Sequence, residues 1–499
     1  TVPGPERLDT DSPIKLDSSD KPYLPATAIG GLLRGTAENL ITALNGWDED
    51  DLRHLFGAER EDDDARRKKK KEDWHHPSRL RLHDATLKSH WHGSEVRDGV
   101  GIDRQRASAR EHALYNYEIV PAGSEFSLLM ELRDGDKKDR QLLALTLEAL
   151  SQLPTGIGAK GNSGLGTLKL EIEKVVTLDL TQKDVLFKFL KQEPGFDLKN
   201  ECGPTWDEWL KNNLPKGIAL DQEKPPETWR IPQAVTFTYR LKVKDPLLIR
   251  GREAPESALQ DYRERKELTL GDDKGIDATW IGRGDHPTAP NWVPVLPGSS
   301  LRGVFRSHCE RILRTLWWHH VSGEREKYRR VVIASDPLLN PRDTSQKDDN
   351  CHLRSNGLWI QSKGSDWWKE KYSNEAIAVW ENSNLGERMW GSSQWKSRVL
   401  VSEAEIPDGE KDQWGELLFQ NVAINRFTGG ASDQKLFNAL AVTHATFEGS
   451  ITVFGNEPWM IGLVALLFKD LTDGLIRAGS GKTRGRGLFE GCLEKVEVK

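Results

Sequence analysis

Apolar residues recur along the chain with two different periods, and the order of the two periods is repeated. The segments EIVPAGSEFSLLMEL and THATFEGSITVF carry apolar residues at every second position between glycine turns, which predicts strands. The segments LLALTLEALSQL and WMIGLVALLFKDLTDGLI carry them three and four positions apart, which predicts helices. A glycine-rich loop and a further strand-like segment, LGTLKLEIEKV or GLFEGCLEKVEV, follow each helix. The pattern predicts an α+β fold with two similar units.

Three matches in the same order indicate that one unit occurs twice. PATAIGGLLRG at Pro25 resembles PGSSLRGVFRS at Pro297, which is an offset of 272 residues. GIDRQRASAREHALYNYE matches AINRFTGGASDQKLFNA at an offset of 322, and the glycine loops GIGAKGNSGLGTL and RAGSGKTRGRGLF match at 321. The increase of about 50 residues predicts an insertion between the first two motifs of the second unit, in the tryptophan-rich stretch at about 317–414.

The matches divide the chain into two expected domains and a connector. We expect the first unit at 1–180, the connector at 181–232 and the second unit at 233–499. The second unit opens with the strand-like segment AVTFTYRLKV, whereas only 24 residues precede the first motif of the first unit. We therefore expect an upstream segment or a neighbouring subunit to supply the opening strand of the first unit. Thr27 and Ser300 are expected to cap the helices that follow them.

Composition narrows the class of protein only in part. Of the 499 residues, 36% are hydrophobic and 30% are charged, and the longest apolar run is too short to span a bilayer. Four scattered cysteines (Cys202, Cys309, Cys351 and Cys492) indicate a reducing compartment, so we expect a cytoplasmic protein with no membrane partner. The net charge of -6 does not favour a nucleic-acid partner, so any such partner must be bound by local basic clusters.

The two glycine loops are candidate phosphate-binding segments. Glycine lets backbone amides approach phosphate oxygens closely, and Lys160, Lys482, Arg484 and Arg486 add positive charge. The sequence GSGKT resembles part of a P-loop, but the full spacing fails at Arg477, so we do not expect hydrolysis of nucleoside triphosphates. The alternative for each loop is a glycine-rich turn between a helix and a strand.

Together these motifs resemble the repeat-associated (RAMP) superfamily of CRISPR effector proteins, and among them the backbone subunits of type III complexes. In the first unit the likeness lies in DSPIKLDSSDKPYLPATAIGGLLRG, RLRLHDA, VRDGVGIDRQRASAREHALYNYEIVPAGSEF and the glycine loop. In the second unit it lies in VPVLPGSSLRGVFR, VAINRFTGGASDQKLFN and GSGKTRGRG. Two such units in one chain resemble the fused double backbone subunit of type III-D effectors.

The resemblance implies a modified ferredoxin-like or RNA-recognition palm in each unit, with a hairpin thumb around Asp103 to Tyr117 in the first. It implies guide RNA, target RNA and other type III effector subunits as partners. Tyr115 and Phe437 are expected either to stack on unpaired bases or to pack in the core. The arginines suited to bidentate phosphate contact are Arg34, Arg104, Arg106, Arg302, Arg306 and Arg426.

The resemblance also implies that the aspartate of the Asp-Ser-Pro loop, Asp11, is required for cutting target RNA. A carboxylate beside a splayed phosphodiester can hold Mg²⁺ or another divalent cation. The second unit has no Asp-Ser-Pro, and Asp277 in GIDATW is our choice there because it precedes the same helix turn. Asp285 and Asp245 remain alternatives. Each of these aspartates is also a common turn former.

We therefore expect an RNA-guided backbone subunit with one metal-dependent endoribonuclease site in each unit. Two alternatives stay open: a guide scaffold that cuts nothing, and a metal-independent guide-processing ribonuclease that uses histidine as general acid and base. The first helix turn of each unit has no histidine, which argues against the second alternative. The histidines between 75 and 92 and the charged run at 62–71 are interpreted as solvated insertions, and the tryptophans as core anchors or subunit contacts.

Overall fold

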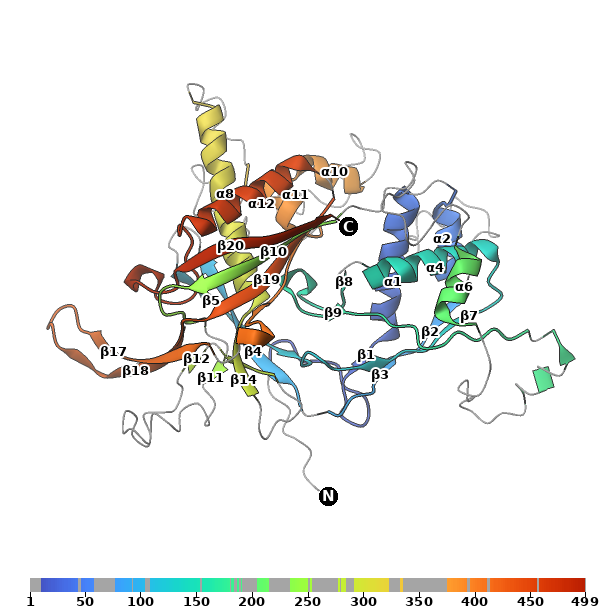
Figure 1. Ribbon diagram of the computed structural model, residues 1–499, viewed down its shortest axis with the longest axis horizontal. Coiled ribbons are helices and arrows are strands. Elements are labelled where there is room, and N and C mark those ends of the chain that lie inside the picture. Colours follow the sequence, from blue (N-terminus) through green and yellow to red (C-terminus); the bar gives the residue numbers. More distant parts are fainter. Residues whose placement is uncertain are drawn as a thin grey trace, which may run out of the picture.

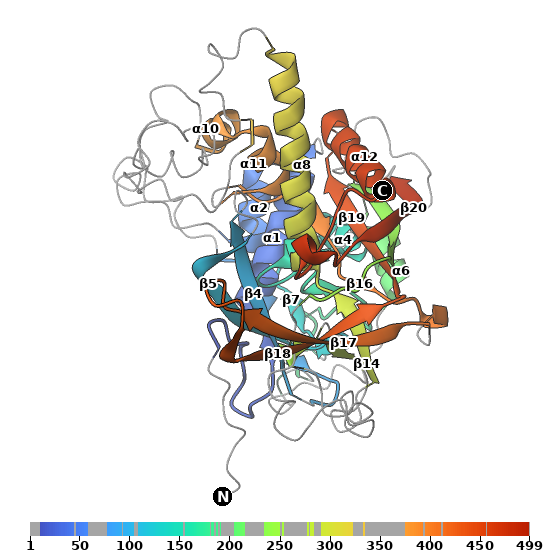
Figure 2. The same cartoon turned by 90° about the vertical axis from the view of Figure 1, so that its left-hand side faces the viewer.

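The computed structural model has two lobes (Figure 1). One lobe contains the helices near the N-terminus, and the other contains a large sheet and two long helices (Figure 2). Within the described residues the fold is mixed, with eight α-helices and several small antiparallel sheets beside the large one. The described residues are 10–43, 46–57, 77–91, 93–103, 108–152, 155–179, 181–183, 186–187, 190, 204–214, 234–249, 252–253, 277–278, 280–283, 291–322, 333–334, 375–392, 395–410, 413–455 and 457–498.

The first unit contains short strands around a pair of packed helices, while its long hairpin at 95–119 lies in the lobe of the large sheet (Figure 1). Its elements in chain order are β1 (Tyr23–Leu24), α1 (Ala26–Ala43), α2 (Glu49–Phe56), β2 (Leu80–Leu82), β3 (Ala85–Leu87), β4 (Glu95–Asp103), β5 (Ser108–Ile119), β6 (Phe126–Ser127), β7 (Met130–Leu132), α4 (Lys137–Gln152), β8 (Thr155–Gly156), η2 (Gly161–Ser163) and β9 (Thr167–Leu168), followed by α6 (Trp206–Asn213). Ile29 and Leu33 of α1 share one buried apolar cluster with Leu142 and Leu143 of α4. The helix predicted from LLALTLEALSQL is thus confirmed as α4.

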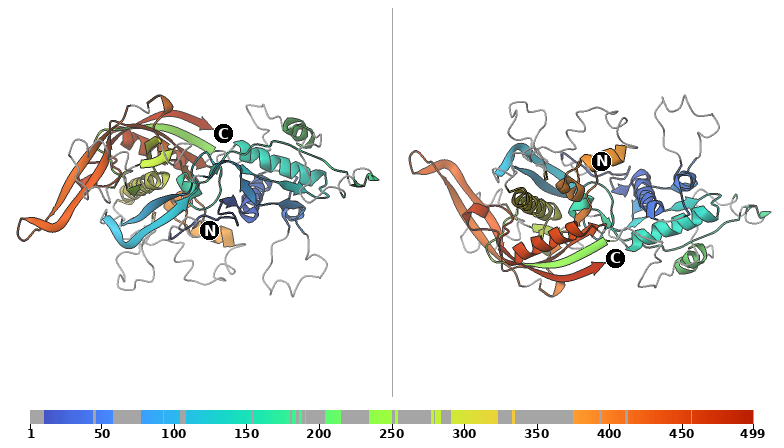
Figure 3. Two further views of the ribbon diagram at one scale, coloured as in Figure 1. Left: turned by 90° about the horizontal axis from the view of Figure 1, so that it is seen from below. Right: turned by 90° about the horizontal axis from the view of Figure 1, so that it is seen from above.

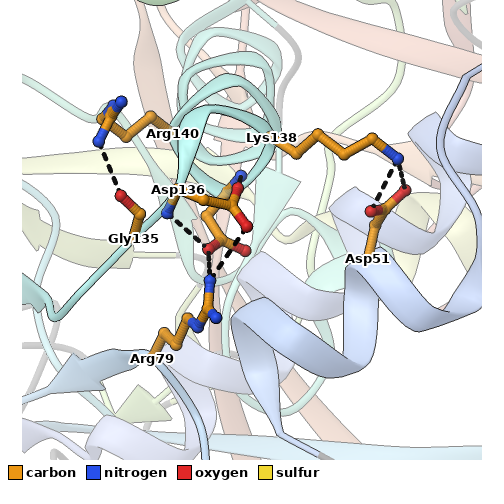
Figure 4. Close-up of polar contacts among 7 residues, drawn as sticks. Asp51, Arg79, Gly135, Asp136, Lys138 and Arg140 are labelled. Atoms are coloured by element: carbon orange, nitrogen blue, oxygen red, sulfur yellow. Dashed lines mark hydrogen bonds and ion pairs between the residues drawn. The ribbon is translucent and has the colours of Figure 1, made fainter.

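Charged residues fix the N-terminus of α4 (Figure 4). The guanidinium of Arg79 binds the buried carboxylate of Asp139 and lies 3.2 Å from that of Asp136. The Asp139 backbone N–H donates a hydrogen bond to Asp136, which lowers the pKa of Asp136. Lys138 Nζ lies 3.0 Å from the carboxylate of Asp51 on α2. These contacts tie α4 to α2 and to the residue that precedes β2.

The second lobe contains the large sheet. Its elements are β10 (Ala234–Val243), β11 (Arg252–Glu253), β12 (Asp277–Ala278), β13 (Trp280–Arg283), β14 (Asn291–Leu296), α8 (Gly298–His320), α10 (Glu375–Asn382), α11 (Leu385–Trp390), β15 (Val399–Val401), β16 (Ala404–Glu405), η6 (Asp408–Glu410), β17 (Gly415–Ile424), β18 (Ala431–Thr443), β19 (Thr446–Phe454), α12 (Pro458–Thr472), η7 (Lys482–Arg484) and β20 (Phe489–Val498). The predicted helix before the second glycine loop is confirmed as α12, and the predicted strand after it as β20.

The large sheet has the strand order β13-β14-β16-β19-β10-β20, and β15 also pairs with β19. β10 forms antiparallel ladders with both β19 and β20. Buried side chains of β10 meet both long helices: the Tyr239 ring centroid lies 5.9 Å from that of Phe305 on α8 and 5.5 Å from that of Phe468 on α12. The two helices therefore cover one face of the sheet, as the view from above shows (Figure 3).

Two expectations about helix starts are wrong. The Ala26 backbone N–H at the start of α1 donates a 2.7 Å hydrogen bond to the carboxylate of Asp84, a residue 58 positions away. α8 begins after Pro297 and has no side-chain cap. Thr27 and Ser300 are therefore not the capping groups. The Asp84 carboxylate binds the first amide of α1, and Pro297 precedes the first residue of α8.

The strand expected to close the first unit is also wrong in extent. Only Thr167 and Leu168 form a strand, β9, whereas β20 in the second unit has 10 residues. β20 pairs with β10, and the described part of the first unit offers no strand in the corresponding position. Without that partner, LKLEIEKV has no ladder to join, although Leu170 and Ile172 still pack against the core. The external source of that opening strand stays a prediction.

The structure also adds a fourth repeat and refines the insertion. LRLHDATL at Leu80 corresponds to VLVSEAEI at Val399, because each contains two short strands and a buried alanine, Ala85 or Ala404. β15 and β16 thus belong to the repeated unit and pair with β19, although the expected insertion included them. The added residues lie between α8 and Val399.

None of the helices in the described part of the chain has the length and hydrophobicity of a membrane-spanning helix.

Candidate nucleic-acid interface

Two long hairpins have the same register at an offset of 322 residues. β4 and β5 form the first, where Asp98 faces Asn116, and β17 and β18 form the second, where Gln420 faces Asn438. Both ladders shift register at the same place, after Val100 in the first hairpin and after the corresponding residue of the second. The hairpin expected around Asp103 is therefore present in both units. Its role as a thumb stays a prediction.

Both hairpins expose aliphatic side chains at equivalent positions. Val100 and Ile102 are 44% and 40% exposed, and their counterparts Val422 and Ile424 are 45% and 55% exposed. Phe427, at the tip of the second hairpin, is 99% exposed. A pair of exposed β-branched residues that occurs in both copies contributes nothing to either core, so it points to an apolar binding surface.

Asp11 lies in an exposed loop against β5. Its backbone N–H donates to the Asn116 side-chain oxygen at 2.7 Å, and its carboxylate Oδ2 accepts from the Asn116 backbone N–H at 2.9 Å. The next residues continue along the strand, because the Glu118 N–H donates to the Ser12 carbonyl and the Ile14 N–H donates to the Glu118 carboxylate. The loop thus runs parallel to β5 and places an exposed carboxylate beside the hairpin.

The candidate aspartate of the second unit lies in the same relation to its hairpin. Asp277 forms β12 with Ala278, and this strand runs parallel to β18 with Asp277 in register with Ala439. Ala439 follows Asn438, the counterpart of Asn116. This placement describes the backbone of β12 and not the side chain of Asp277. Of the two alternatives, Asp245 forms a 2.6 Å ion pair with Arg477, and Asp285 lies outside the described residues.

The two glycine loops have matching backbones. Gly166 and Gly487 have φ angles of 68° and 72°, and each carbonyl accepts a hydrogen bond from the residue where the loop begins, Ile157 or Ala478. A Cβ on either glycine would overlap the carbonyl oxygen of that same residue. Glycine is required there both by the positive φ and by this close approach.

The first glycine loop is covered by the second unit. A Cβ on Gly164 would lie 2.7 Å from the backbone nitrogen of Glu403, and one on Gly298 would lie 2.8 Å from the Val401 carbonyl and closer still to that of Ser163. Backbone therefore meets backbone at the start of α8. The second loop differs: a Cβ on Gly485 would meet no atom within 4 Å.

A buried ion pair lies at the same contact between units. Arg97 of β4 is 5% exposed and binds the carboxylates of Glu95 and of Glu403, which lies 306 residues later. Burial opposes the charge of Arg97, but the attraction of Glu403 and Glu95 outweighs it and raises the pKa of Arg97. This ion pair has little access to water and joins the two units, so it helps to fix how they dock.

Lys160 of the first glycine loop faces tyrosines. Its Nζ lies 4.1 Å from the ring centroid of Tyr115 and 4.0 Å from that of Tyr117, and it donates a 2.8 Å hydrogen bond to the Tyr115 hydroxyl. Tyr117 is buried, which raises its pKa, and its hydroxyl faces Ser299 at the start of α8. Tyr117 therefore packs inside the protein. Tyr115 is 38% exposed, and the side chain of Phe437 lies outside the described residues.

Three of the arginines selected for phosphate contact bind groups of the chain itself. Arg34 pairs with Glu38 at 3.0 Å, and the buried Arg306 pairs with Glu310 at 2.8 Å. Arg302 donates to the Trp390 carbonyl, and burial lowers the pKa of Arg302 to about 10, so it stays charged at neutral pH. These guanidinium groups hold α1, α8 and α11 in place, and their contact with RNA stays a prediction.

Most of the exposed candidate basic residues in the described part of the chain belong to the second unit, although Arg110 of the first hairpin is exposed too. Arg484 and Arg426 are exposed and Lys482 is half-buried, whereas Arg486 lies buried with its guanidinium carbon 3.7 Å from the ring centroid of Phe419. Burial lowers the pKa of Arg486. Arg104 and Arg106 lie outside the described residues.

The described histidines and acids form no multidentate metal site. His83 binds Glu131 at 2.7 Å, and His75, His76 and His92 lie outside the described residues. Among the residues placed by the structure, no group of three histidine, cysteine or acidic side chains is arranged to hold a metal ion. The exposed Asp11 carboxylate is the kind of oxygen ligand that Mg²⁺ takes, so its chemistry fits such a cation.

A family model described as the RAMP superfamily matches residues 4–169 and 274–490. These regions make up well over half of the 499 residues and contain both hairpins and both glycine loops. The chain belongs to the RAMP superfamily. Membership indicates a CRISPR-associated RNA-binding subunit, because RAMP proteins bind RNA and work in multi-subunit complexes. No curated protein matches the chain.

Sequence reasoning missed two residues of these RAMP units. Asn116 lies within the repeated motif, but the sequence alone does not show that it makes both hydrogen bonds to Asp11. Glu403 falls within the expected insertion, yet it binds Arg97 of the other unit. Comparison of RLHDA with LVSEA identifies Glu403 as the counterpart of Asp84.

Proposed function

We propose that this chain is a double backbone subunit of a type III CRISPR effector, that it binds guide RNA, and that it cleaves complementary target RNA at two metal-dependent carboxylate sites. Asp11 serves the first site and Asp277 the second. The observation that supports this best is their common placement. Each aspartate lies on a segment parallel to the second strand of a hairpin, within one residue of Asn116 or Asn438.

The sheet connectivity supports an RNA-recognition palm in the second unit. Along the chain the elements β10, α8, β15 with β16, β19, α12 and β20 alternate as strand, helix, two strands, helix and strand. Their order in the sheet, with β10 between β19 and β20, is that of a split βαβ fold. RNA-recognition modules of this kind bind the bases of RNA on the surface of the sheet and on its loops.

The hairpins supply surfaces for bases rather than for phosphates. Val422, Ile424 and Phe427 project apolar groups into solvent, and Val100 and Ile102 do so in the first unit. Apolar wedges of this type separate stacked bases and bend the strand at that step. A target strand bent beside each hairpin would present one phosphodiester to the adjacent aspartate.

The chemistry at each site follows from a carboxylate beside such a bent linkage. Asp11 is exposed, and one of its oxygens is oriented by Asn116, so it can hold a divalent cation against a target phosphate. When bound, the cation neutralises the charge that develops on the phosphoryl oxygens. The hairpin places the neighbouring 2′-hydroxyl in line with the leaving oxygen.

The phosphates of the guide are assigned mainly to the second glycine loop. Lys482 and Arg484 project from it, and the Gly485 position is open. Arg426 lies on the adjacent hairpin and extends the same basic group. The first loop contributes less, because Gly164 and Ser163 are covered by the second unit.

Separate substitutions of the two aspartates test the proposal. Asp11→Asn and Asp277→Asn are placed in the assembled complex with guide RNA, and cuts in a labelled target RNA are mapped. Each variant is expected to lose one cut by at least about 100-fold and to bind target normally, because the carboxylate charge is needed for the cation but not for pairing. Asp20→Asn is the matched control, because Asp20 is exposed in the same loop and its positive φ of 55° suits asparagine.

Two results would contradict it. Unchanged cleavage in the double variant would favour the non-catalytic scaffold. Cleavage that continues in EDTA would favour histidine-driven, metal-independent chemistry.

A further inference from the structure

Asn116 makes reciprocal contacts with Asp11. The Asn116 backbone N–H points away from β4 and donates to Asp11 Oδ2 at 2.9 Å, while the Asn116 side-chain oxygen accepts from the Asp11 N–H at 2.7 Å. The first bond orients the carboxylate, and the second fixes the backbone that carries it. One hairpin residue thus controls both the position and the rotation of the carboxylate.

The remaining contacts of the loop do not perform this task. Glu118 binds the backbone of Ser12 and Ile14, so it aligns the loop with β5. Neither bond reaches the Asp11 carboxylate. Loss of the Asn116 side chain would therefore keep the bond from the Asn116 N–H to the Asp11 carboxylate but remove the acceptor of the Asp11 N–H. The loop would stay on the strand at Ser12 and Ile14, while the main chain at Asp11 could shift.

The second unit keeps the same residue at the same place. Asn438 faces Gln420 across its hairpin, as Asn116 faces Asp98, and it directly precedes the register partner of Asp277. Asn438 is 9% exposed, but within the described residues its side-chain oxygen accepts no hydrogen bond, whereas that of Asn116 accepts from the Asp11 N–H. The second hairpin therefore repeats the position of the amide but not the hydrogen bond to its side-chain oxygen.

We propose that Asn116 is a positioning residue that holds the Asp11 segment against its hairpin in the orientation needed for cleavage. The inference rests on the proposed function. It adds to the first site a residue that touches the aspartate and not the RNA. Its prediction is that Asn116 affects the first cut only.

Asn116→Ala and Asn438→Ala test this in the guide-loaded complex. Single-turnover rates at each cut are measured with saturating target. Asn116→Ala is expected to slow the first cut by about 10- to 100-fold, because misplacement of a catalytic group by 1 Å has an effect of that size, and to leave the second cut unchanged. Asn438→Ala is the matched control, because it removes the same side chain from the second hairpin and should leave the first cut unchanged.

Asn116→Asp separates positioning from a purely structural role. The new carboxylate still accepts from the Asp11 N–H, so the loop stays anchored as in the wild type. The rate of the first cut in Asn116→Asp is therefore expected to exceed that in Asn116→Ala by at least about threefold, because the backbone of Asp11 stays in place. Equal rates in the two variants would contradict the positioning role.

The outcomes distinguish this inference from the function on which it rests. A first cut within twofold of wild type in Asn116→Ala, together with its loss in Asp11→Asn, overturns the positioning role alone. Loss of both cuts or of guide RNA binding in Asn116→Ala also overturns it, because the residue would then support the fold. A first cut that survives Asp11→Asn overturns the proposed function itself.

Discussion

The two units share their motifs, yet only the second builds a continuous sheet. β10 pairs with β19 on one side and β20 on the other, and the sheet that contains these strands has seven strands. The first unit has the three-stranded sheet β1-β3-β6 and separate pairs of strands. The difference shows that an alternating sequence becomes a strand only when a partner edge is present, since backbone hydrogen bonds must be satisfied between strands.

The units also differ in what stabilises their helices. In the second unit the aromatic rings of Tyr239, Phe305 and Phe468 fill the space between the sheet and both helices. In the first unit leucines pack α1 on α4, and the Arg79 to Asp139 contact fixes the end of α4 (Figure 4). The smaller unit therefore depends more on polar links and on its docking to the larger one.

The largest effect is expected where the units join. Arg97→Ala removes the buried guanidinium that binds the largely buried carboxylates of Glu403 and Glu95, and removing one partner of a buried pair costs about 3–5 kcal/mol. We expect a loss of that order in the free energy of unfolding, measured by urea denaturation. Arg97→Lys should lose less, because it keeps the charge but not the planar fork.

The control for this variant is an exposed pair. Lys169→Ala removes a 2.6 Å contact with Glu171 whose side chains are 83% and 71% exposed, and no measurable change is expected. Equal stability of Arg97→Ala and Lys169→Ala would show that the ion pair does not join the units.

A second prediction concerns the first residue of α8. Gly298→Ala places a Cβ against the Ser163 and Val401 carbonyls, so the glycine loop must retreat, and overpacking of this kind costs about 1–3 kcal/mol. Gly303→Ala on the same helix meets no atom within 4 Å and should be neutral or stabilising by up to about 1 kcal/mol. Thermal unfolding of both variants checks the contrast, and equal melting temperatures would contradict the docking.

The corresponding residue of α1 explains why this contact occurs once. Ala26 occupies the position of Gly298, and its N–H binds Asp84, where Glu403 of the second unit instead receives Arg97. The matching motifs have thus diverged at the two residues that docking requires. The start of α1 is not a second copy of the docking surface.

Local patterns predicted much of this fold. The helices α4 and α12, the strand β20 and the hairpin β4–β5 all follow from periodicity or repeat spacing, because neighbours along the chain determine them. The extent of β9 did not, since it depends on a partner strand far away in sequence. The strand propensity of a segment carries no information on whether a partner strand is present beside it.

The candidate site was predictable in part for the same reason. The family resemblance indicated Asp11 and the hairpin, and the structure brings them together. The burial of Arg306 beside Glu310 was not visible, because a basic residue on a helix looks alike whether it faces solvent or the core. The contact of Arg97 with Glu403 joins residues 306 positions apart, which no local pattern indicates.

The smallest effect is expected from pH, and it should come from the second unit. His308 of α8 binds Asp470 of α12 at 2.6 Å, and its Nδ1 accepts from Arg311 at 2.9 Å, whereas Thr36 stands at the matching position of α1. Burial lowers the pKa of His308 below its ordinary value of about 6.5, and Arg311 also opposes protonation, although Asp470 favours it.

A histidine with a lowered pKa binds fewer protons in the folded state than in the unfolded state. Stability should therefore be highest above pH 6.5 and fall as pH decreases from there, until the folded-state pKa has been passed. The buried thiol of Cys309 stays protonated throughout this range, because burial raises its pKa. Unfolding free energies between pH 7.5 and about pH 5 measure the slope. His308→Gln keeps a donor for Asp470 but cannot titrate, so its slope should be smaller, and an equal slope would place the pH dependence elsewhere.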